Sequence, residues 1–573
     1  MDERMTKEDE KILVEARERY KKLSDANFHN KEIWKEGVRF SFNIEEGQWD
    51  SKDIENRTKE KRPYLTSNKL AKFVNQVVNA EKGIPNTDDV IPTDDKGDVK
   101  IASVYNDLII DIEYRSEMED IIGLAGEHAA AGGHGYWRYL TKYMDDSMDQ
   151  EIFAAPILNP LNVDVDPRGM YGYIRECLPK DEFKEKWDVD PTDFVNGDDD
   201  SLWYEDEKVW IAEYFRKVPV NRVLVEVHDP VTGETSVIEE TDETKATIKK
   251  LLEKRRRTAK SYKVEWYKLC GHKILEKGIW PGSTIPIVEV VGHEVHYQGK
   301  TYKLPLVWDA LGPQKIVNYW LTSFTEKVAL MPKAPIMVTS QQISGYETGW
   351  GQLNTKNMNY IVYNQTGAGE PHRLDPPQIG SGDLMLLNIG NNDIKDTLGI
   401  YDPGLGAQSN ERSGKAIMAR AARSDLATST FPNNLMKAKL KGKRLLIEII
   451  PKVYDTARTI RLRNTGENVQ LNFPAIDWDG EGEKILINDL SKGRYDYRIK
   501  SITNPSRRQQ TTDAIREAMQ YAPGVADLLL PLFFENTDVA GAEKIAAALM
   551  KRSQLIEQSL LNKQQPPSGG NIM

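Results

Sequence analysis

The sequence predicts an α+β fold made of several structural units. A chain of 573 residues is longer than one compact core accommodates, so about two to four units are expected. Apolar residues follow helical spacing near both ends of the chain, whereas alternating patterns typical of strands dominate from about residue 133 to 307. Between 308 and 331, apolar residues recur at every fourth position, which predicts a long helix outside the strand-rich part.

The N-terminal part is predicted to be helical, with charged residues over 5–25, a helix after the stretch "RPYLTSNKL" at 62–70 and another near 100–130. Strands follow, including "NPLNVDVDP" at 159–167 and "IPIVEVV" at 285–291. The charged segment 242–260, "DETKATIKKLLEKRRRTAK", interrupts them and is interpreted as a solvated helix.

The second half of the chain predicts a helical hairpin with an elaborated tip. The first helix carries Ile316, Trp320, Phe324 and Val328 at i+4 spacing, a Gly- and Asn-rich excursion follows, and a second helix precedes residue 398. A glycine-dense loop then leads into a long helical region with breaks expected at its two prolines. Later strands are expected to return to the β part begun earlier, and helices are expected from Pro505 and from Asp538 or Ala540 before a polar tail. The two prolines are Pro432 and Pro451.

Composition limits the possible functions. The 77 basic residues stand against 88 acidic ones, a formal charge of −11, so the chain as a whole is no general nucleic-acid binder. The charged N-terminus, the absence of an eighteen-residue apolar run and only two cysteines, Cys177 and Cys270, predict a soluble, disulfide-free protein made in the cytosol.

The stretch "YDPGLGAQSNERSGKAIMAR" at 401–420 is similar to a phosphate-binding loop, and an ATPase built on Gly414-Lys415 is one alternative function. The Walker pattern requires a glycine five residues before Gly414 and a hydroxyl after the lysine. Ser409 and Ala416 occupy these two positions. The loop also follows a predicted helix instead of a buried strand, and no apolar run ending in Asp lies nearby to hold a metal ion. The pattern argues against nucleotide binding.

The sequence gives only weak indications of metal-binding or acid-base sites. Asp164 and Asp166, two apart in a strand, are the basis of a second alternative, a metal-dependent hydrolase, although a solvated strand end with an Asp-Pro turn is favoured. His293, Glu294 and His296 form "HEVH" in a strand-like pattern, with histidines three apart where a zinc-protease helix needs four. We expect no catalytic residues, no metal and no cofactor.

Two further segments have features of binding sites. The first half of "DWDGEGEKILIND" matches the ligand spacing of a calcium-binding loop, at Asp477, Asp479, Glu481 and Gly482. The twelfth position, which should be Glu, is Asn488, so a hairpin turn is favoured. The basic run Lys249 to Lys260 supports a third alternative, a nucleic-acid-binding module.

The order of elements resembles a portal protein, the head-to-tail connector of tailed double-stranded DNA bacteriophages, and most of all the short-tailed (podovirus) branch. The resemblance covers about residues 35–520 and depends on an ordered series of short motifs. These are "GQW" at 47–49, "RPYLTSNKL", the cluster Gly132, Gly133 and Gly135, "NPLNVDVDP", Gly292, the helix residues Gln314, Asn318, Tyr319, Ser323 and Glu326, "LLIEIIPKVYDTARTIRL" at 445–462 and "GRYDYRI" at 493–499.

The resemblance implies a portal fold assembled as a ring, with the chain divided into wing, stem, clip, tunnel loop and helical crown. The implied boundaries are wing 1–307, stem helix 308–331, clip 332–378, stem helix 379–397, tunnel loop 398–413, a long kinked helix 414–458 returning to the wing, wing strands 459–503, crown 504–560 and a disordered tail 561–573. Because the chain stops about seventy residues after "GRYDYRI", a crown without a long helical barrel is expected.

The resemblance also implies the function: a ring of twelve copies at one capsid vertex through which the genome is packaged and ejected. Twelve copies at −11 carry about −132, which suits a channel that DNA must slide through without sticking. In the tunnel loop, Gln408, Asn410, Glu411 and Arg412 would face the DNA.

The implied partners are other proteins of the phage. The clip, with Tyr346, Glu347 and Trp350 near its tip, would dock the terminase large subunit and later head-to-tail adaptor or tail proteins. The major capsid protein, scaffold and double-stranded DNA are further expected partners, whereas a membrane is not. The protein would reside in the virion, and in the host cytoplasm before assembly.

Overall fold

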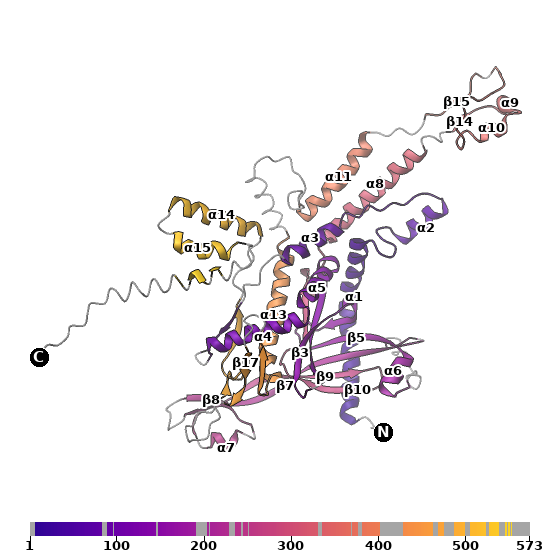
Figure 1. The fold of residues 1–573 in the computed structure, drawn as a ribbon. Helices are drawn as coiled ribbons and strands as arrows, with labels where there is room; N and C mark the ends of the chain where they lie inside the picture. The colour runs from indigo at the N-terminus through magenta and orange to yellow at the C-terminus, as the bar shows by residue number, and fades with distance from the viewer. Residues whose placement is uncertain are drawn as a thin grey trace. The chain divides into compact units, whose positions relative to one another are not determined.

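The fold was analysed in a computed structural model of the chain. The structure describes residues 6–82, 89–94, 97–144, 147–190, 203–205, 207–228, 235–241, 244–249, 251–330, 335–367, 369–375, 381–400, 428–461, 468–474, 486–498, 505–522, 526–537, 545–546, 548–550 and 552. It contains both helices and antiparallel sheets, which confirms the predicted α+β class (Figure 1). Among these residues no helix is both long and apolar enough to cross a lipid bilayer.

The chain forms two compact units, which are described separately. The larger unit comprises Met1–Trp34, Val78–Leu304 and Thr430–Met573, and the smaller unit comprises Lys35–Val77 and Pro305–Ser429. Helix α1 (Lys7–Phe42) and helix α3 (Ala71–Lys82) each contribute residues to both units.

The core of the larger unit is a three-stranded sheet covered by helices. The strand order is β11 (Ile287–Val291), β2 (His134–Tyr143) and β3 (Gln150–Pro156), all antiparallel. Helices α4 (Val99–Arg115), α5 (Met118–Gly132) and α13 (Thr430–Val453) pack on it. Trp137 of β2 is fully buried, and a Cβ added to Gly442 of α13 would lie 3.3 Å from its ring. Close packing of this kind fixes the helix against the sheet.

A second, larger sheet runs in the order β10 (Ile274–Trp280), β9 (Leu252–Leu269), β7 (Lys208–His228), β5 (Tyr171–Pro179) and β4 (Val163–Val165). The short strands β6 (Tyr204–Glu205) and β8 (Thr235–Glu239) also pair with β7. Tyr20 of α1 contacts Tyr173 and Trp203, so α1 packs on one face of this sheet. Helix α6 (Lys180–Trp187) follows β5 and buries Phe183.

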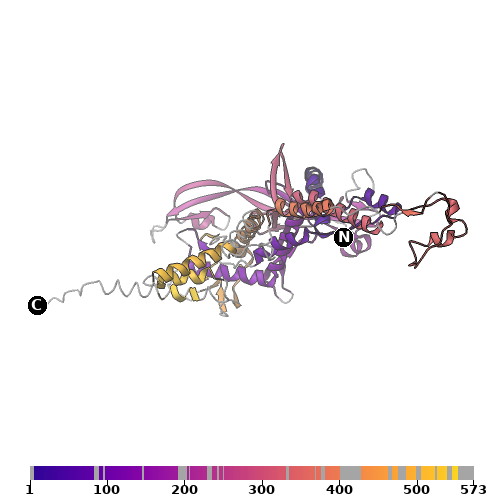
Figure 2. The same ribbon diagram turned by 90° about the horizontal axis from the view of Figure 1, so that it is seen from above.

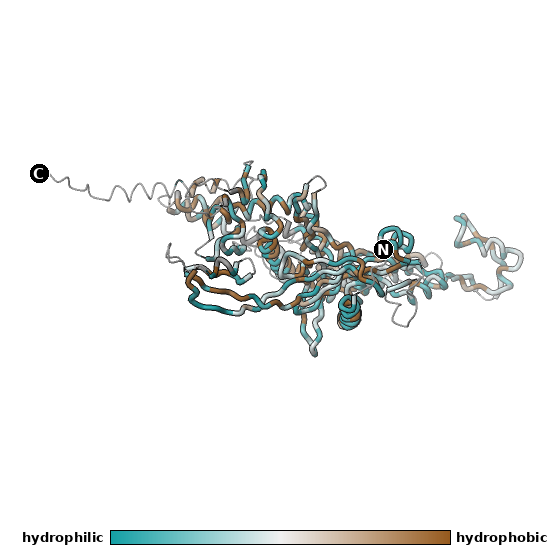
Figure 3. The backbone as a smooth tube through the Cα atoms, turned by 90° about the horizontal axis from the view of Figure 1, so that it is seen from below, coloured by the Kyte–Doolittle hydropathy of each residue, from teal (hydrophilic) through white to brown (hydrophobic). Residues whose placement is uncertain are grey.

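The predicted charged helix at 242–260 is wrong. Only Lys245–Ile248 is helical (α7), and from Leu252 onward the chain belongs to β9, which pairs with β7 along almost its whole length. Cross-strand ion pairs such as Arg255 with Glu226 favour this register. In Figure 3 the charged half of β9 is teal, beside the more apolar β7. Strand pairing has therefore overridden local helix propensity.

The late strands return to the larger unit, as predicted. β20 (Tyr495–Arg498) pairs with β1 (Asp89–Pro92), a strand begun four hundred residues earlier. Arg458 reinforces this return, because its guanidinium lies 3.2 Å from the Glu151 carboxylate of β3. The remaining described strand pairs of the larger unit are β12 (His293–Tyr297) with β13 (Lys300–Leu304), β16 (Arg458–Arg461) with β17 (Asn468–Leu471), and β18 (Phe473–Pro474) with β19 (Leu486–Ile487).

The expected break at Pro451 is corrected in α13, whereas the break expected at Pro432 is not tested, because residues 401–427 lie outside the described part. Pro432 lies in its first turn, where the missing N–H has no intrahelical acceptor to lose, and Pro451 lies in its last turn, so neither breaks the helix between Thr430 and Val453. Helix α14 (Pro505–Tyr521) begins at Pro505 as predicted and lies beside α15 (Ala526–Glu535) (Figure 2). Helix α15 was not predicted, and residues 538–544 lie outside the described part.

The smaller unit is built on a helical hairpin. Helix α8 (Leu311–Leu330) follows the turn Trp308–Ala310, and helix α11 (Ser381–Leu398) packs beside it and contacts the same turn, so the two run antiparallel. Between them lies a tip with β14 (Ile336–Met337), α9 (Ser340–Ile343), α10 (Glu347–Gly351) and β15 (His372–Arg373). Helix α2 (Ser51–Lys59) also belongs to this unit. The predicted helix at 308–331 is confirmed.

Candidate functional site

Helix α8 carries a row of buried polar side chains, which we call the polar ladder: Gln314, Asn318 and Thr322. They hold the extended segment Leu65–Lys69. The backbone N–H of Leu65 donates to Thr322 Oγ1 at 3.0 Å, that of Ser67 to Asn318 Oδ1 at 2.9 Å, and that of Lys69 to Gln314 Oε1 at 3.1 Å. The helix thus takes the place of a neighbouring strand.

The helix and the extended segment advance by similar distances between successive contacts, which explains why the hydrogen bonds of the polar ladder repeat regularly. Four helical residues advance about 6.0 Å, and two residues of an extended chain advance about 6.6 Å. Every fourth side chain of α8 can therefore meet every second backbone N–H of the extended segment. The match fixes one register between the two elements.

Gln48 extends the polar ladder into the rest of the smaller unit. Its Oε1 accepts a hydrogen bond from Asn318 Nδ2 at 2.7 Å, and its Nε2 donates to Phe40 O and to Asn68 Oδ1. Gln48 is only 2% exposed, so loss of any one partner would leave a buried polar group unpaired. One turn beyond Thr322, Glu326 binds Arg62 through two hydrogen bonds of 2.8 and 3.1 Å, and these lower the pKa of the Glu326 carboxyl.

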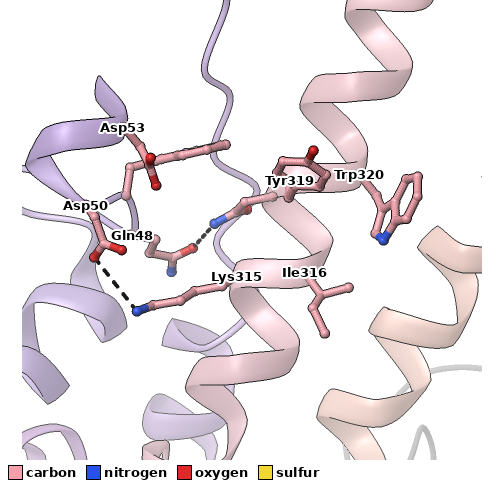
Figure 4. Close-up of a pocket in the computed structure, with 9 residues that line it drawn as sticks. Gln48, Asp50, Asp53, Lys315, Ile316, Tyr319 and Trp320 are labelled. Atoms are coloured by element: carbon pink, nitrogen blue, oxygen red, sulfur yellow. Dashed lines mark hydrogen bonds and ion pairs between the residues drawn. The ribbon is translucent and has the colours of Figure 1, made fainter. Parts of the chain in front are cut away.

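A groove lies beside the polar ladder, with a volume of about 240 Å³ (Figure 4). We call it the α8 groove. Its lining residues are Gln48, Trp49, Asp50, Asp53, Lys315, Ile316, Asn318, Tyr319 and Trp320. Figure 4 shows Lys315 reaching toward Asp50, 3.8 Å away, while Ile316 and Trp320 project from the other side of α8. The groove combines aromatic walls with a charged rim.

The outer faces of the hairpin are apolar but exposed. On α8, the outer residue Tyr319 is 51% exposed, whereas Ile316, 47% exposed, lies at the seam with α11, 3.7 Å from where a Cβ on Gly390 would be. On α11, Met385 is 64% and Ile389 43% exposed. Of the residues whose spacing predicted α8, Ile316 and Val328 are exposed and Trp320 and Phe324 are half-buried, so this row does not form the buried face of the helix. Exposed apolar residues that gather into a patch are a feature of contact surfaces for other proteins.

The tip contains the three residues predicted as a docking surface. Tyr346 is 42% exposed and precedes α10. Glu347 accepts the backbone N–H of Gly345 at 3.1 Å, and Trp350 Nε1 donates to the carbonyl of Val362 at 3.0 Å. Glu347 and Trp350 thus shape the tip, and a docking role for the three residues stays a prediction. The predicted channel residues Gln408, Asn410, Glu411 and Arg412, and the Gly414-Lys415 loop, lie outside the described residues.

The two aspartates of the hydrolase alternative have separate structural roles. Asp164 is 1% exposed, pairs with Lys31 at 2.7 Å and accepts a hydrogen bond from Asn27, so the predicted solvated strand end is wrong for this residue. Asp166 accepts the N–H groups of Arg168 and Met170 in the following turn. Nothing in this arrangement supports hydrolase chemistry.

The other candidate metal segments have ordinary strand contexts. His293, Glu294 and His296 lie on β12, as predicted, and their strand pairs with β13. The strands flanking the "DWDGEGEKILIND" turn pair with one another, although Asp477, Asp479, Glu481 and Gly482 lie outside the described part. Within the described residues, no group of three His, Cys, Asp or Glu side chains is placed to hold a metal ion.

The structure is that of an α+β protein with exposed apolar residues on its helical hairpin, which are suited to contact with other proteins. A family model described as phage P22-like portal protein matches residues 17–569. A portal protein of Acyrthosiphon pisum secondary endosymbiont phage 1 is 22% identical over 574 residues, and the match covers 92% of this chain and 78% of that protein.

The chain therefore belongs to the P22-like family of phage portal proteins, which confirms the resemblance seen in the sequence. Its role is that of a structural head-to-tail connector, and it is a virion component at a capsid vertex.

Proposed function

We propose that this chain assembles as a ring of about twelve copies, the number implied by the resemblance, and that the phage genome passes through the ring during packaging and ejection. The observation that carries the proposal is the pair of exposed apolar faces on the α8–α11 hairpin. A subunit with two different contact faces binds its neighbours head to tail, and such contacts close into a ring when the rotation between copies allows it.

In this proposal α8 and α11 are the stem, the tip over 332–378 is the clip, and the strand-rich larger unit is the wing. The clip would dock the packaging ATPase first and the adaptor or tail proteins later. Energy for DNA movement comes from that motor, so the ring supplies a passage and a mounting surface. The formal charge of −11 per copy supports a channel that does not hold DNA tightly.

Negative-stain microscopy of the purified full-length chain tests the proposal. We expect ring-shaped particles with a central hole, and native mass spectrometry should give one closed copy number. A preparation that stays monomeric up to high micromolar concentration would contradict the ring. ATP hydrolysis that is lost in Lys415→Ala would support the nucleotide-dependent alternative instead.

A further inference from the structure

The two outer faces of the hairpin point in opposite directions. α11 packs on α8 through Gly390 and Ile394, since a Cβ added to Gly390 would lie 2.9 Å from Val317 and Ile394 is 1% exposed. At 100° per residue, Met385 and Ile389 lie about 180° and 140° around α11 from Ile394. On α8, Tyr319 lies about 160° from Val317 by the same spacing. Each helix therefore turns these side chains away from the other.

The two faces also lie at the same level along the hairpin. Because α8 and α11 are antiparallel and Gly390 faces Val317, Ile389 is level with about residue 318 and Met385 with about residue 322, at 1.5 Å per residue. Tyr319 and the α8 groove are thus at the height of Met385 and Ile389. A second copy set beside the first in the same orientation would bring these residues together.

The α8 groove has the chemistry to receive such side chains. Trp49 and Tyr319 provide apolar walls, and Lys315, Asp50 and Asp53 provide a polar rim, as in the core and rim of protein interfaces. Arg57 lies 5.1 Å from the ring of Trp49 and 5.8 Å from that of Tyr319, which steadies both rings. Methionine, with its flexible thioether, fills irregular apolar space well.

We propose that the α8 groove of one copy receives Met385 and Ile389 from α11 of the next copy. The inference rests on the proposed ring, and it assigns the two halves of one interface between neighbouring copies. The occupant is a second copy because the complementary apolar residues are on the same hairpin, at the same level and on the opposite face. The contact is heterologous, so each copy uses one half toward each neighbour.

Disulfide trapping tests the pairing directly. In a background with Cys177→Ala and Cys270→Ala, verified to form rings, Tyr319→Cys and Ile389→Cys are introduced separately and together. A disulfide requires Cα atoms within about 7 Å. The double variant should give a ladder of covalent multimers under mild oxidation, and either single variant should give none.

The matched control replaces Tyr319→Cys by Val328→Cys, combined with Ile389→Cys. Val328 is 42% exposed on the same helix, but about 14 Å farther along it at 1.5 Å per residue. The control pair should not cross-link. Rings in which the Tyr319/Ile389 pair fails to cross-link, or in which one single variant cross-links to itself, would overturn this inference and leave the ring proposal standing. Absence of rings would overturn both.

A second measurement uses Ile389→Asp and Ile389→Leu in the native-cysteine protein. A carboxylate buried in the interface beside Asp50 and Asp53 is unfavourable, whereas leucine preserves apolar contact. We expect Ile389→Asp to raise the concentration needed for half-assembly by roughly 30-fold, the effect of losing one strong interface residue. Equal assembly of the aspartate and leucine variants would refute the contact, and circular dichroism checks that each variant is folded.

Discussion

The larger unit and the α8 hairpin fix their elements by opposite means. In the larger unit, Trp137, Tyr139 and Ile152 are almost fully buried in an apolar core. In the smaller unit, the most buried side chains on α8 include Gln314, Asn318 and Thr322, and their partners are backbone N–H groups. In the larger unit, apolar burial holds the sheet and helices together. The smaller unit also buries apolar side chains such as Leu70 and Phe73, but a set of specific hydrogen bonds positions segment 65–69 on α8.

Apolar burial and hydrogen bonding specify the position of an element to different degrees. Burial of a large apolar side chain contributes about 1.5–3 kcal/mol but is non-directional, so neighbouring registers are separated only by packing. A satisfied hydrogen bond contributes about 1 kcal/mol, yet a slipped register leaves buried donors without acceptors, which is costly. The polar ladder therefore adds little gross stability and fixes the position of 65–69 along α8.

The largest expected effect is in the apolar core. Trp137→Ala should lower the free energy of unfolding of the larger unit by about 3–5 kcal/mol, because it leaves a cavity beside Gly442 and the sheet. Urea unfolding measures the loss of stability, and hydrogen exchange of the α4 and β2 amides shows that the loss lies in the larger unit. Tyr143→Ala, at the exposed end of the same strand, is the control and should change stability by less than about 0.5 kcal/mol.

Acid should destabilise the larger unit more than segment 65–69 of the smaller unit. Burial lowers the pKa of His128 to about 4 and that of His134 to about 3, from an ordinary value of 6.5. Both histidines are neutral in the folded larger unit, so the unfolded chain binds more protons below pH 6.5. Their contribution is present above that pH and is lost as the pH falls toward the folded pKa values. Between pH 7 and pH 5 the loss should be roughly 3–4 kcal/mol for the pair.

The measurement is hydrogen exchange at both pH values, corrected for intrinsic rates, in the larger unit and in segment 65–69. His128→Leu should remove about half of the pH dependence in the larger unit, since one of the two titrating groups is gone. An unchanged pH dependence in that variant would show that the buried imidazole of His128 does not titrate as described. Segment 65–69 contains no histidine and should respond less.

The polar ladder should be most sensitive at its centre. Asn318→Leu removes the acceptor of the Ser67 N–H and of Gln314 Nε2 and the donor to Gln48, leaving buried polar groups unpaired. We expect a loss of about 2–3 kcal/mol, concentrated in faster exchange of Ser67 and Lys69. Ser323→Ala, on the same helix outside the polar ladder, serves as the control. Comparable protection in both variants would mean that another interaction holds the segment.

The class of the fold and its helical hairpin were predictable because they depend on local periodicity. The apolar row Ile316, Trp320, Phe324 and Val328 correctly predicted a helix, but it did not identify the buried face. A parallel row of polar residues at the same spacing, Gln314, Asn318, Thr322 and Glu326, was the available signal for the polar ladder. Its meaning depended on segment 65–69, some 250 residues away, and single-sequence periodicity carries no information on such a partner.

The other differences between the sequence-based predictions and the structure also arise from contacts between residues far apart in the chain. The charged segment 242–260 has helical composition, yet most of it pairs with β7. Asp164 lies just before an Asp-Pro turn, which predicts a solvated strand end, yet the residue is buried and forms an ion pair with Lys31 of α1. The sequence alone gives no structural reason for a glycine at position 133. The structure supplies its reason, because its φ is +100° and a Cβ there would lie 2.2 Å from the Lys303 carbonyl oxygen.

The smallest expected effect comes from the end of the polar ladder. Thr322→Val keeps the shape of the side chain but removes the acceptor of the Leu65 N–H. The Leu65 carbonyl keeps its hydrogen bond from Trp49 Nε1 at 3.2 Å, so only one backbone group loses its main partner. The loss should be about 1 kcal/mol, which means roughly fivefold faster exchange at Leu65 and little change at Lys69. Thr322→Val could instead speed hydrogen exchange at Leu65, Ser67 and Lys69 together. That result would show that the three hydrogen bonds are cooperative, and that the whole polar ladder, not Asn318 alone, sets the register of segment 65–69 on α8.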